Sequence, residues 1–268
     1  MARKRKSTPG PYLLHLELLR DRIPDANQFP YNLPAVRGLT TLPFHPKVSF
    51  LIGENGSGKS TLLEAVAVGC GLNPEGGSRN FNFATRASHS PLAESIRLAK
   101  AIATPRDSYF LRAESFYNVA SEIDRLDRES GGPRIIDAYG GQSLHEQSHG
   151  ESFFSLFKNR YGDHGLYLMD EPEAALSPRR QLEFLVLLHD YVKRGGQFVI
   201  ATHSPIIMAY PDACIYQLDG EGIREVAYTE TEHYLVTRGF LSSPQRSLAT
   251  LLAQDTEAGP GAAAALRV

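Results

Sequence analysis

One twelve-residue segment limits what this chain can fold into more than any other. "LIGENGSGKSTL", at positions 51–62, places three glycines, a lysine and several hydroxyl side chains directly behind an apolar run. Glycines let successive backbone N–H groups turn toward one centre, and a helix that starts there presents its positive end to an anion. The apolar run predicts a strand over 47–52, and Leu62, Leu63 and Val66 recur at helical spacing behind the glycines. The order of strand, loop and helix predicts a phosphate-binding unit.

The loop matches the phosphate-binding pattern at every fixed position. Lys59 is expected to reach the β- and γ-phosphates of a nucleoside triphosphate, and Ser60 to bind Mg²⁺. ATP and Mg²⁺ are therefore the expected cofactors. The candidate nucleotide-binding residues are Asn55, Gly56, Ser57, Gly58, Lys59, Ser60 and Thr61.

A second candidate lies in "LYLMDEP", an apolar run that ends in two acids. Two carboxylates at the end of a buried strand lose hydration, which costs free energy, so their presence there favours a functional role. Asp170 is placed to lie beside the metal, and Glu171 is placed to polarise the water that attacks the phosphate. A surface turn is the alternative for this segment taken alone.

Apolar strands and amphipathic helices alternate through the rest of the chain. Strands are expected over 12–19, 47–52, 108–116, 164–173 and 197–205, helices over 90–103, 118–130, 151–161 and 177–196, and a hairpin over 214–228. This alternation predicts an α/β fold with a mainly parallel sheet flanked by helices. From Ser242 onward the chain leads to an alanine- and glycine-rich end, and we expect this segment to be disordered.

The composition excludes several classes of protein. The chain has 268 residues, 42% of them hydrophobic, and a formal charge of −2, so it offers no general attraction for nucleic acid. The basic run from Arg3 to Lys6 is too short and too terminal to change that. Cys70 and Cys214 are too few for a disulfide framework, and no apolar run of 18 residues occurs. We expect a cytoplasmic protein that is neither secreted nor membrane-spanning.

With these motifs the chain resembles the ATP-binding-cassette (ABC) type of P-loop ATPase, and in particular the branch that includes SMC and RecF-like proteins. The resemblance spans about residues 12–219: the loop 53–60, "SHGES" at 148–152, "MDEPEAALS" at 169–177 and "ATHSP" at 201–205 follow in the family's order. It implies an ABC-ATPase head, with an antiparallel β N-terminal part and a helical lid subdomain at about 85–160. It also implies one domain over 1–242 and a flexible tail over 243–268.

The resemblance also assigns residues that spacing alone would not. Ser148, Gly150 and Glu151 occupy the family's signature motif, which touches the γ-phosphate held by a second copy. Taken alone, "SHGES" is first of all a helix cap. His203 matches the switch histidine that senses the γ-phosphate, whereas a lone histidine at a strand end is more often structural.

The chain departs from the family at two places, and the residue that stacks on adenine is undetermined. The lid glutamine is replaced, and Glu114 is assigned to its role with Arg112 and Gln142 as alternatives. Ser177 stands where the family often has aspartate. Phe29 and Tyr31 are candidates to stack on adenine, although loop aromatics are as often packing residues.

The resulting function is Mg²⁺-dependent ATP hydrolysis through an ATP-sandwich homodimer, in DNA repair or maintenance or in defence. One alternative is an ATP-gated module that regulates a partner protein. Another is the ATPase subunit of a membrane transporter. Only 34 positions separate Glu114 from Ser148, so no SMC-type coiled-coil arm fits between them. A role on DNA, or a particular protein partner, rests on family analogy alone.

Overall fold

The computed structural model describes residues 11–78, 90–129, 134–146 and 149–257. It divides into two compact units, Met1–Val226 and Ala227–Val268. Within the described residues, all the strands belong to the first unit, and the second unit contains helices.

A six-stranded sheet is the centre of the first unit, with the order β5-β6-β7-β3-β8-β9. The strands are β3 (Val48–Ile52), β5 (Asp107–Arg112), β6 (Gly165–Asp170), β7 (Gln197–Ala201), β8 (Cys214–Asp219) and β9 (Gly222–Glu225). The neighbouring strands from β5 to β8 in this order are parallel. Strand β9 pairs antiparallel with β8 and forms the predicted hairpin. Every residue of β3, β6 and β7 is buried, as expected for a parallel sheet covered on both faces.

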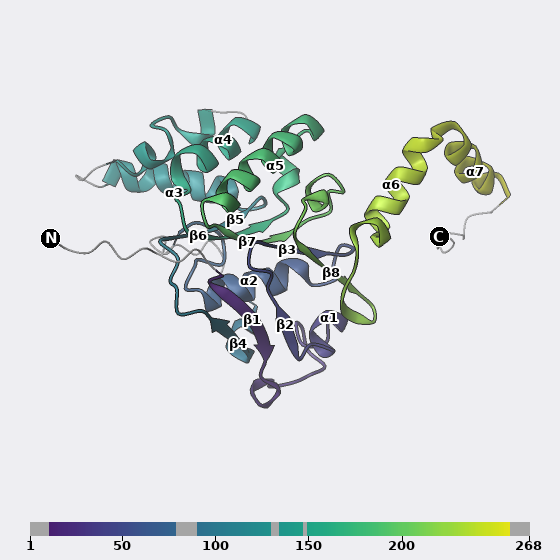
Figure 1. Cartoon of the computed structure of the whole chain (residues 1–268), viewed down its shortest axis with the longest axis horizontal. Helices are drawn as coiled ribbons and strands as arrows, with labels where there is room; N and C mark the ends of the chain where they lie inside the picture. The colour runs from purple at the N-terminus through teal and green to yellow at the C-terminus, as the bar shows by residue number, and fades with distance from the viewer. Residues whose placement is uncertain (1–10, 79–89, 130–133, 147–148, 258–268) are drawn as a thin grey trace. The chain divides into compact units, whose positions relative to one another are not determined.

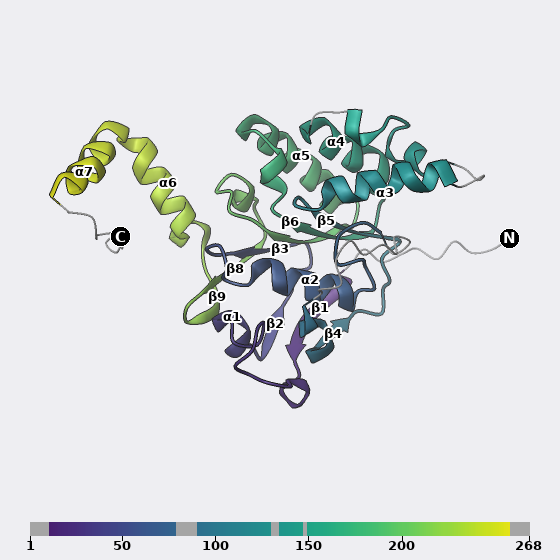
Figure 2. The same cartoon turned by 180° about the vertical axis from the view of Figure 1, so that it is seen from behind.

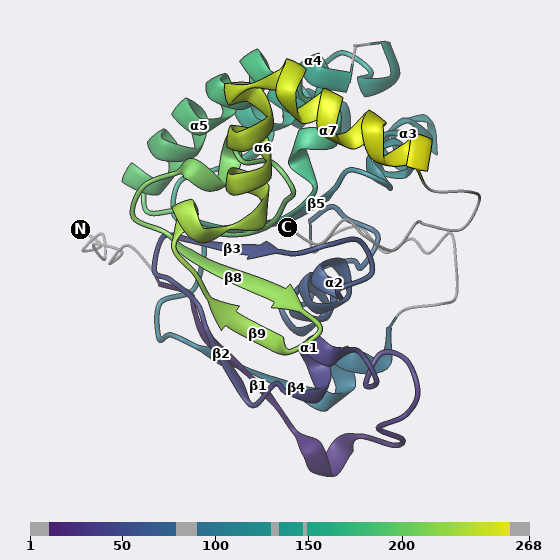
Figure 3. The ribbon, with the colours of Figure 1, turned by 90° about the vertical axis from the view of Figure 1, so that its right-hand side faces the viewer.

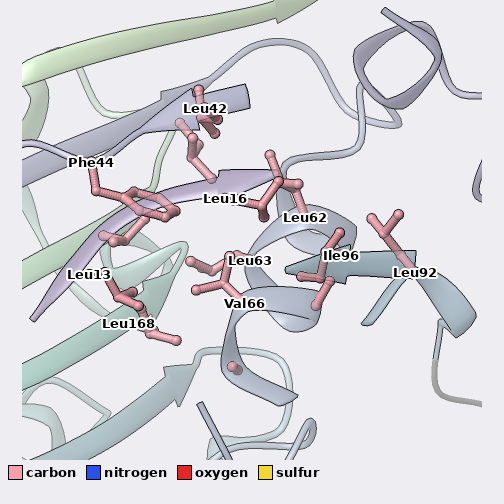
Figure 4. Close-up of a cluster of buried hydrophobic side chains, with 14 of the residues drawn as sticks. Leu13, Leu16, Leu42, Phe44, Leu62, Leu63, Val66, Leu92, Ile96 and Leu168 are labelled. Carbon is pink, nitrogen blue, oxygen red and sulfur yellow. The ribbon is translucent and has the colours of Figure 1, made fainter. Parts of the chain in front are cut away.

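A smaller antiparallel sheet, with the order β2-β1-β4, lies below the large one in Figure 1. It consists of β1 (Leu13–Leu18), β2 (Thr41–Pro43) and β4 (Ile96–Lys100). Helix α2 (Lys59–Gly69) lies between the two sheets, as seen from both sides in Figures 1 and 2. Figure 4 shows Leu62, Leu63 and Val66 of α2 packed among leucines of both sheets. Burial of this apolar face fixes the helix that follows the glycine loop.

One buried amide joins the two sheets. Gln197, at the start of β7, accepts hydrogen bonds from the backbone N–H groups of Tyr12 and Leu13 at 2.7 and 2.9 Å. Its amide nitrogen donates to the carbonyls of Leu13 and His45 at 2.8 and 3.0 Å. The side chain therefore uses both polar ends without access to water, which fixes where β1 meets the large sheet.

Three helices cover the other face of the six-stranded sheet. These are α3 (Phe116–Glu129), α4 (His149–Ser155), which continues into a π-helical segment η5 (Leu156–Arg160), and α5 (Pro178–Lys193). In Figures 1 and 3 they lie on the side of the sheet opposite α2. The predicted α/β fold, with its mainly parallel sheet and antiparallel N-terminal part, is confirmed. The short elements are η1 (Arg20–Arg22), α1 (Pro34–Arg37), η2 (Pro91–Ser95), η3 (Ile135–Tyr139), η4 (Leu144–Glu146), η6 (Pro172–Ala175) and η7 (Ile207–Ala209).

The prediction of a helix over 90–103 is wrong. Ser90 does cap a helical turn, since its hydroxyl accepts from the N–H of Leu92, but that turn ends at Ser95. The next five residues form β4, which pairs with β1. Leu92 and Ile96 stand four residues apart and satisfy a helical pattern, but Ile96 and Leu98 also alternate as in a strand. Pairing with β1 is a tertiary interaction that the local pattern does not contain.

The second unit contains η8 (Tyr228–Glu230), α6 (Glu232–Ser242) and α7 (Pro244–Glu257). Thr231 caps α6 by accepting from the N–H of Tyr234 at 3.2 Å. The structure thus gives a helix over Pro244–Glu257, inside the segment expected to be a flexible tail, and residues 258–268 lie outside the described residues. The unit boundary lies after Val226, whereas the predicted domain ended at 242. In the described parts of the chain, no helix combines the length and apolar character needed to cross a bilayer.

Candidate functional site

The glycine loop runs from the end of β3 to the first turn of α2. Gly53, Gly56 and Gly58 have positive φ angles of 145°, 80° and 101°, a conformation that side-chain-bearing residues rarely adopt. A Cβ on Gly53 would also lie 2.2 Å from the carbonyl oxygen of Leu218 in β8. Only glycine fits at that position, because both the backbone angle and the neighbouring strand exclude a side chain.

Two polar side chains of the loop point inward. Lys59 is buried, and its Nζ donates to the carbonyls of Gly53 and Glu54 at 2.8 and 2.9 Å. Burial lowers the pKa of Lys59, and the nearby carboxylates of Glu171, Asp170 and Glu173 partly offset that effect. The Oγ of Ser57 is buried and has no hydrogen-bond partner among the described residues, so it can still pair with a ligand.

Asn55 and Gly56 are exposed at the tip of the loop, and Thr61 is half-buried in the first turn of α2. Ser60 lies in the same turn, and its hydroxyl donates to Oδ1 of Asp170 at 3.0 Å. The two residues predicted to bind Mg²⁺ are therefore in contact, although 110 positions separate them in sequence. A hydroxyl and a carboxylate oxygen are the hard oxygen ligands that Mg²⁺ takes in proteins, so this pair suits that ion.

Asp170 ends β6 and is buried near two cationic side chains, Arg112 and Lys59. The Nε of Arg112 lies 3.6 Å from Oδ2 of Asp170, and the two residues are register partners on β5 and β6. Arg112 also donates to Glu64 of α2 at 2.8 Å. Burial raises the pKa of Asp170 to about 6, while Arg112 and the Ser60 hydroxyl act in the opposite direction.

Glu171 has an unusual backbone conformation. Its φ and ψ of 51° and 53° are left-handed, and its N–H donates to the carbonyl of Ala201 on β7 at 2.9 Å. Such a conformation costs a non-glycine residue of the order of 1 kcal/mol or more and is common at functional sites. Oε1 of Glu171 lies 3.7 Å from Nε2 of His203, so the candidate base and the candidate switch histidine are neighbours.

Sequence reasoning missed Glu173. Its Oε2 accepts from the Thr202 hydroxyl at 2.8 Å, and its Oε1 accepts from the backbone N–H of His203. Burial raises the pKa of Glu173, and the hydrogen bonds from His203 and Thr202 act against that rise. The available signal was the third acid in "DEPE", two positions beyond Glu171.

Arg112 has the most direct contact with the acids among the three candidate lid residues. Glu114, the first choice, is 85% exposed and reaches Arg112 at 3.7 Å. Gln142 is exposed between η3 and η4. The assignment of the lid role to Glu114 stays a prediction, and the geometry gives the alternative Arg112 more support.

The signature segment is described only in part. Ser148 lies outside the described residues, whereas Gly150 and Glu151 are in the first turn of α4. A Cβ on Gly150 would lie 3.5 Å from the carbonyl oxygen of Ala175, so the start of α4 packs closely on the segment that follows the two acids. Ser177, at the end of that segment, caps α5 by accepting from the N–H of Arg180.

The two candidate stacking aromatics differ in exposure. Tyr31 is buried, and its hydroxyl contacts Ser95 Oγ at 2.9 Å and the carbonyl of Pro91 at 3.2 Å. It is a packing residue in this structure. Phe29 is 60% exposed, so its side chain is accessible to a ligand.

Comparison with known proteins assigns both halves of this site. A family model described as "AAA domain" matches residues 30–133, which contain the glycine loop. A second, described as "AAA domain, putative AbiEii toxin, Type IV TA system", matches residues 143–209, which contain the paired acids and His203. The chain contains an AAA/ABC-type P-loop ATPase domain. A domain of this type binds and hydrolyses ATP.

Relatives of the ATPase include export proteins. It is 28% identical over 170 residues to the cytochrome c biogenesis ATP-binding export protein CcmA of Rhodopseudomonas palustris, covering 58% of this chain and 78% of that protein. It is 23% identical over 235 residues to the macrolide export ATP-binding/permease protein MacB of Shigella boydii, covering 79% of this chain but 34% of that protein.

Among solved structures, the SMC head domain of Thermotoga maritima gives a TM-score of 0.42 at 16% identity, covering 81% of this chain and 98% of that one. A nucleotide-free ATP-binding cassette from an ABC transporter gives 0.44 at 15% identity, covering 77% and 89%.

The raised pKa of Asp170 predicts how the stability of the nucleotide-free ATPase depends on pH. The folded protein holds the Asp170 proton more tightly than the unfolded chain, so stability is lost as pH rises from about 4 through the folded pKa of about 6. Asp170→Asn removes this loss. The unfolding free energy of the variant relative to wild type should therefore rise by up to about 3 kcal/mol between pH 4 and pH 7.

Urea denaturation of the wild type and of Asp170→Asn at the two pH values measures this difference. Other titrating groups affect both proteins alike and cancel in the comparison. A difference that stays constant with pH would contradict the burial of an ionisable Asp170. Glu221→Gln, at the exposed turn between β8 and β9, is the matched control and should show no such trend.

Proposed function

We propose that two copies of the ATPase close around two ATP molecules, each held by the glycine loop of one copy and the signature segment of the other. One observation carries this proposal. The loop leads into α2 and the signature begins α4, and these helices lie on opposite faces of the six-stranded sheet (Figures 1 and 3). If both motifs contact one γ-phosphate, a second copy must supply one of them.

The residues divide the chemistry between them. The loop N–H groups, the Ser57 hydroxyl and Lys59 would hold the phosphates, and Ser60 and Asp170 would hold Mg²⁺. The ion would neutralise charge on the phosphate oxygens. Glu171 would accept a proton from the attacking water, and His203, 3.7 Å from Glu171, would orient that water or the γ-phosphate. The lid role falls to Glu114 or Arg112, and Phe29 is the candidate for adenine.

The process that this ATPase serves has several candidates. We propose a cytoplasmic protein acting in DNA repair or maintenance or in defence; the second family model, with its toxin–antitoxin description, supports a role in defence. The export proteins among its relatives support the alternative of a transporter ATPase subunit. An ATP-gated module acting on a partner protein is the third candidate. The formal charge of −2 gives a DNA role no separate support.

The sandwich is tested by oligomeric state. Glu171→Gln protein with Mg·ATP should be a dimer by light scattering, because hydrolysis no longer separates the copies. Adding Ser148→Arg should return it to a monomer while ATP binding persists, since a bulky arginine in the signature blocks closure. Ser121→Arg, at an exposed position on α3, is the matched control and should leave the dimer intact.

Complementation gives a second result. Ser148→Arg chains mixed with Lys59→Ala chains should regain part of the activity, because each mixed dimer contains one complete site. Glu171→Gln protein that stays monomeric at saturating ATP and high protein concentration would exclude the sandwich and leave a single-chain ATPase or a different partner chain.

A further inference from the structure

We infer that Glu173, Thr202 and Gln181 are positioning residues: they form one hydrogen-bonded bracket that holds His203 beside Glu171 and ties it to the segment before α5. The inference rests on the role of His203 in the proposed function. Glu173 lies in η6, Thr202 directly follows β7, and Gln181 lies in α5. None of them is assigned a contact with ATP or Mg²⁺, so each would act through His203.

Glu173 forms the first half of the bracket. Its two carboxylate oxygens accept from two consecutive residues, the hydroxyl of Thr202 and the backbone N–H of His203. Thr202 is fully buried and Glu173 is only partly exposed, so these bonds are largely shielded from water. Burying a carboxylate costs desolvation free energy. Here both carboxylate oxygens accept hydrogen bonds that orient the backbone carrying His203.

Gln181 forms the second half. The Ser204 hydroxyl donates to its Oε1 at 2.5 Å, and its Nε2 donates to the carbonyl of Leu176 at 3.0 Å. The N–H of Ser204 in turn donates to the Thr202 hydroxyl at 3.0 Å, which joins the two halves. Residues 202 to 204 are thus held at each position by a side chain from another element.

The far end of the bracket approaches the signature segment. Leu176 follows Ala175, the residue whose carbonyl lies 3.5 Å from the Cβ position of Gly150. From Ser204, the residue after His203, two hydrogen bonds through Gln181 therefore lead to the backbone next to the segment that packs against α4. The 3.7 Å separation between His203 and Glu171 depends on this backbone staying in place.

Variants at Thr202 and Gln181 test the bracket with little change of shape. Thr202→Val removes the hydroxyl that donates a hydrogen bond to Glu173, whereas Thr202→Ser keeps this hydroxyl. Gln181→Met keeps the length of the side chain and removes both bonds. We expect Thr202→Val, Gln181→Met and Glu173→Gln to lower kcat about tenfold with ATP affinity unchanged, and Thr202→Ser to stay near wild type.

A double-mutant cycle with His203→Ala separates positioning from a merely structural role. If the three residues act through His203, their variants should lower kcat by less than about twofold further in the His203→Ala background. Melting temperatures of all variants are measured beside the kinetics. If Glu173→Gln does not fold, the Thr202→Val and Thr202→Ser pair decides the outcome.

The possible failures are distinguishable. Full additivity, with about tenfold further loss in the His203→Ala background, overturns the bracket but leaves the role of His203 intact. Thr202→Ser losing as much activity as Thr202→Val also overturns it. Wild-type turnover in His203→Ala itself would overturn the role proposed for His203 and the bracket with it.

Discussion

Glu171→Gln should lower ATP turnover by at least about a hundredfold while ATP binding persists. Glutamine keeps the size of the side chain and its ability to hydrogen bond, but it cannot accept a proton from the attacking water. The left-handed backbone at Glu171 is unchanged by this substitution, and the N–H to Ala201 bond remains. Phosphate release measured at saturating Mg·ATP gives the turnover, and calorimetry gives the binding.

Glu221→Gln is the matched control for the loss of one carboxylate and should turn over at the wild-type rate, because Glu221 lies at the exposed β8–β9 turn. Turnover in Glu171→Gln close to wild type would mean that the base lies elsewhere. His203 would then be the next candidate, because it is the neighbouring group able to take a proton.

Lys59→Ala should abolish measurable ATP binding. Lys59 is the only cationic side chain of the loop, and without it the phosphates lose the positive charge that offsets the nearby carboxylates of Asp170 and Glu171. The loss should not arise from unfolding. Burial lowers the pKa of Lys59, so truncation to alanine removes the desolvation of a buried ammonium group along with its two hydrogen bonds to the loop.

Calorimetric titration with Mg·ATP measures binding, and circular dichroism melting checks the fold. Lys193→Ala, at the exposed end of α5, removes one lysine elsewhere and should bind ATP like the wild type. ATP binding by folded Lys59→Ala as tight as that of wild type would show that the nucleotide site is misplaced.

The elements that the sequence predicted well are those whose determinants are contiguous. The glycine loop needs positive φ angles at three nearby positions, and glycine alone satisfies them at little cost, so the motif and its conformation coincide. The strands β6 and β7 could be recognised because each consists mainly of a continuous apolar run, and every residue of both strands is buried. The segment 90–103 failed because its apolar spacing satisfies both a helix and a strand.

The sequence by itself thus determined the phosphate loop, the two acids at the end of a strand and the parallel sheet. Only the tertiary structure decided that Arg112 contacts Asp170 and that Glu173 holds the backbone of His203. These pairs meet because β5, β6 and β7 are neighbours and end at one edge of the sheet. Strand order depends on how all the helices pack at once, so no local pattern around Arg112 or Glu173 records which residue will face it.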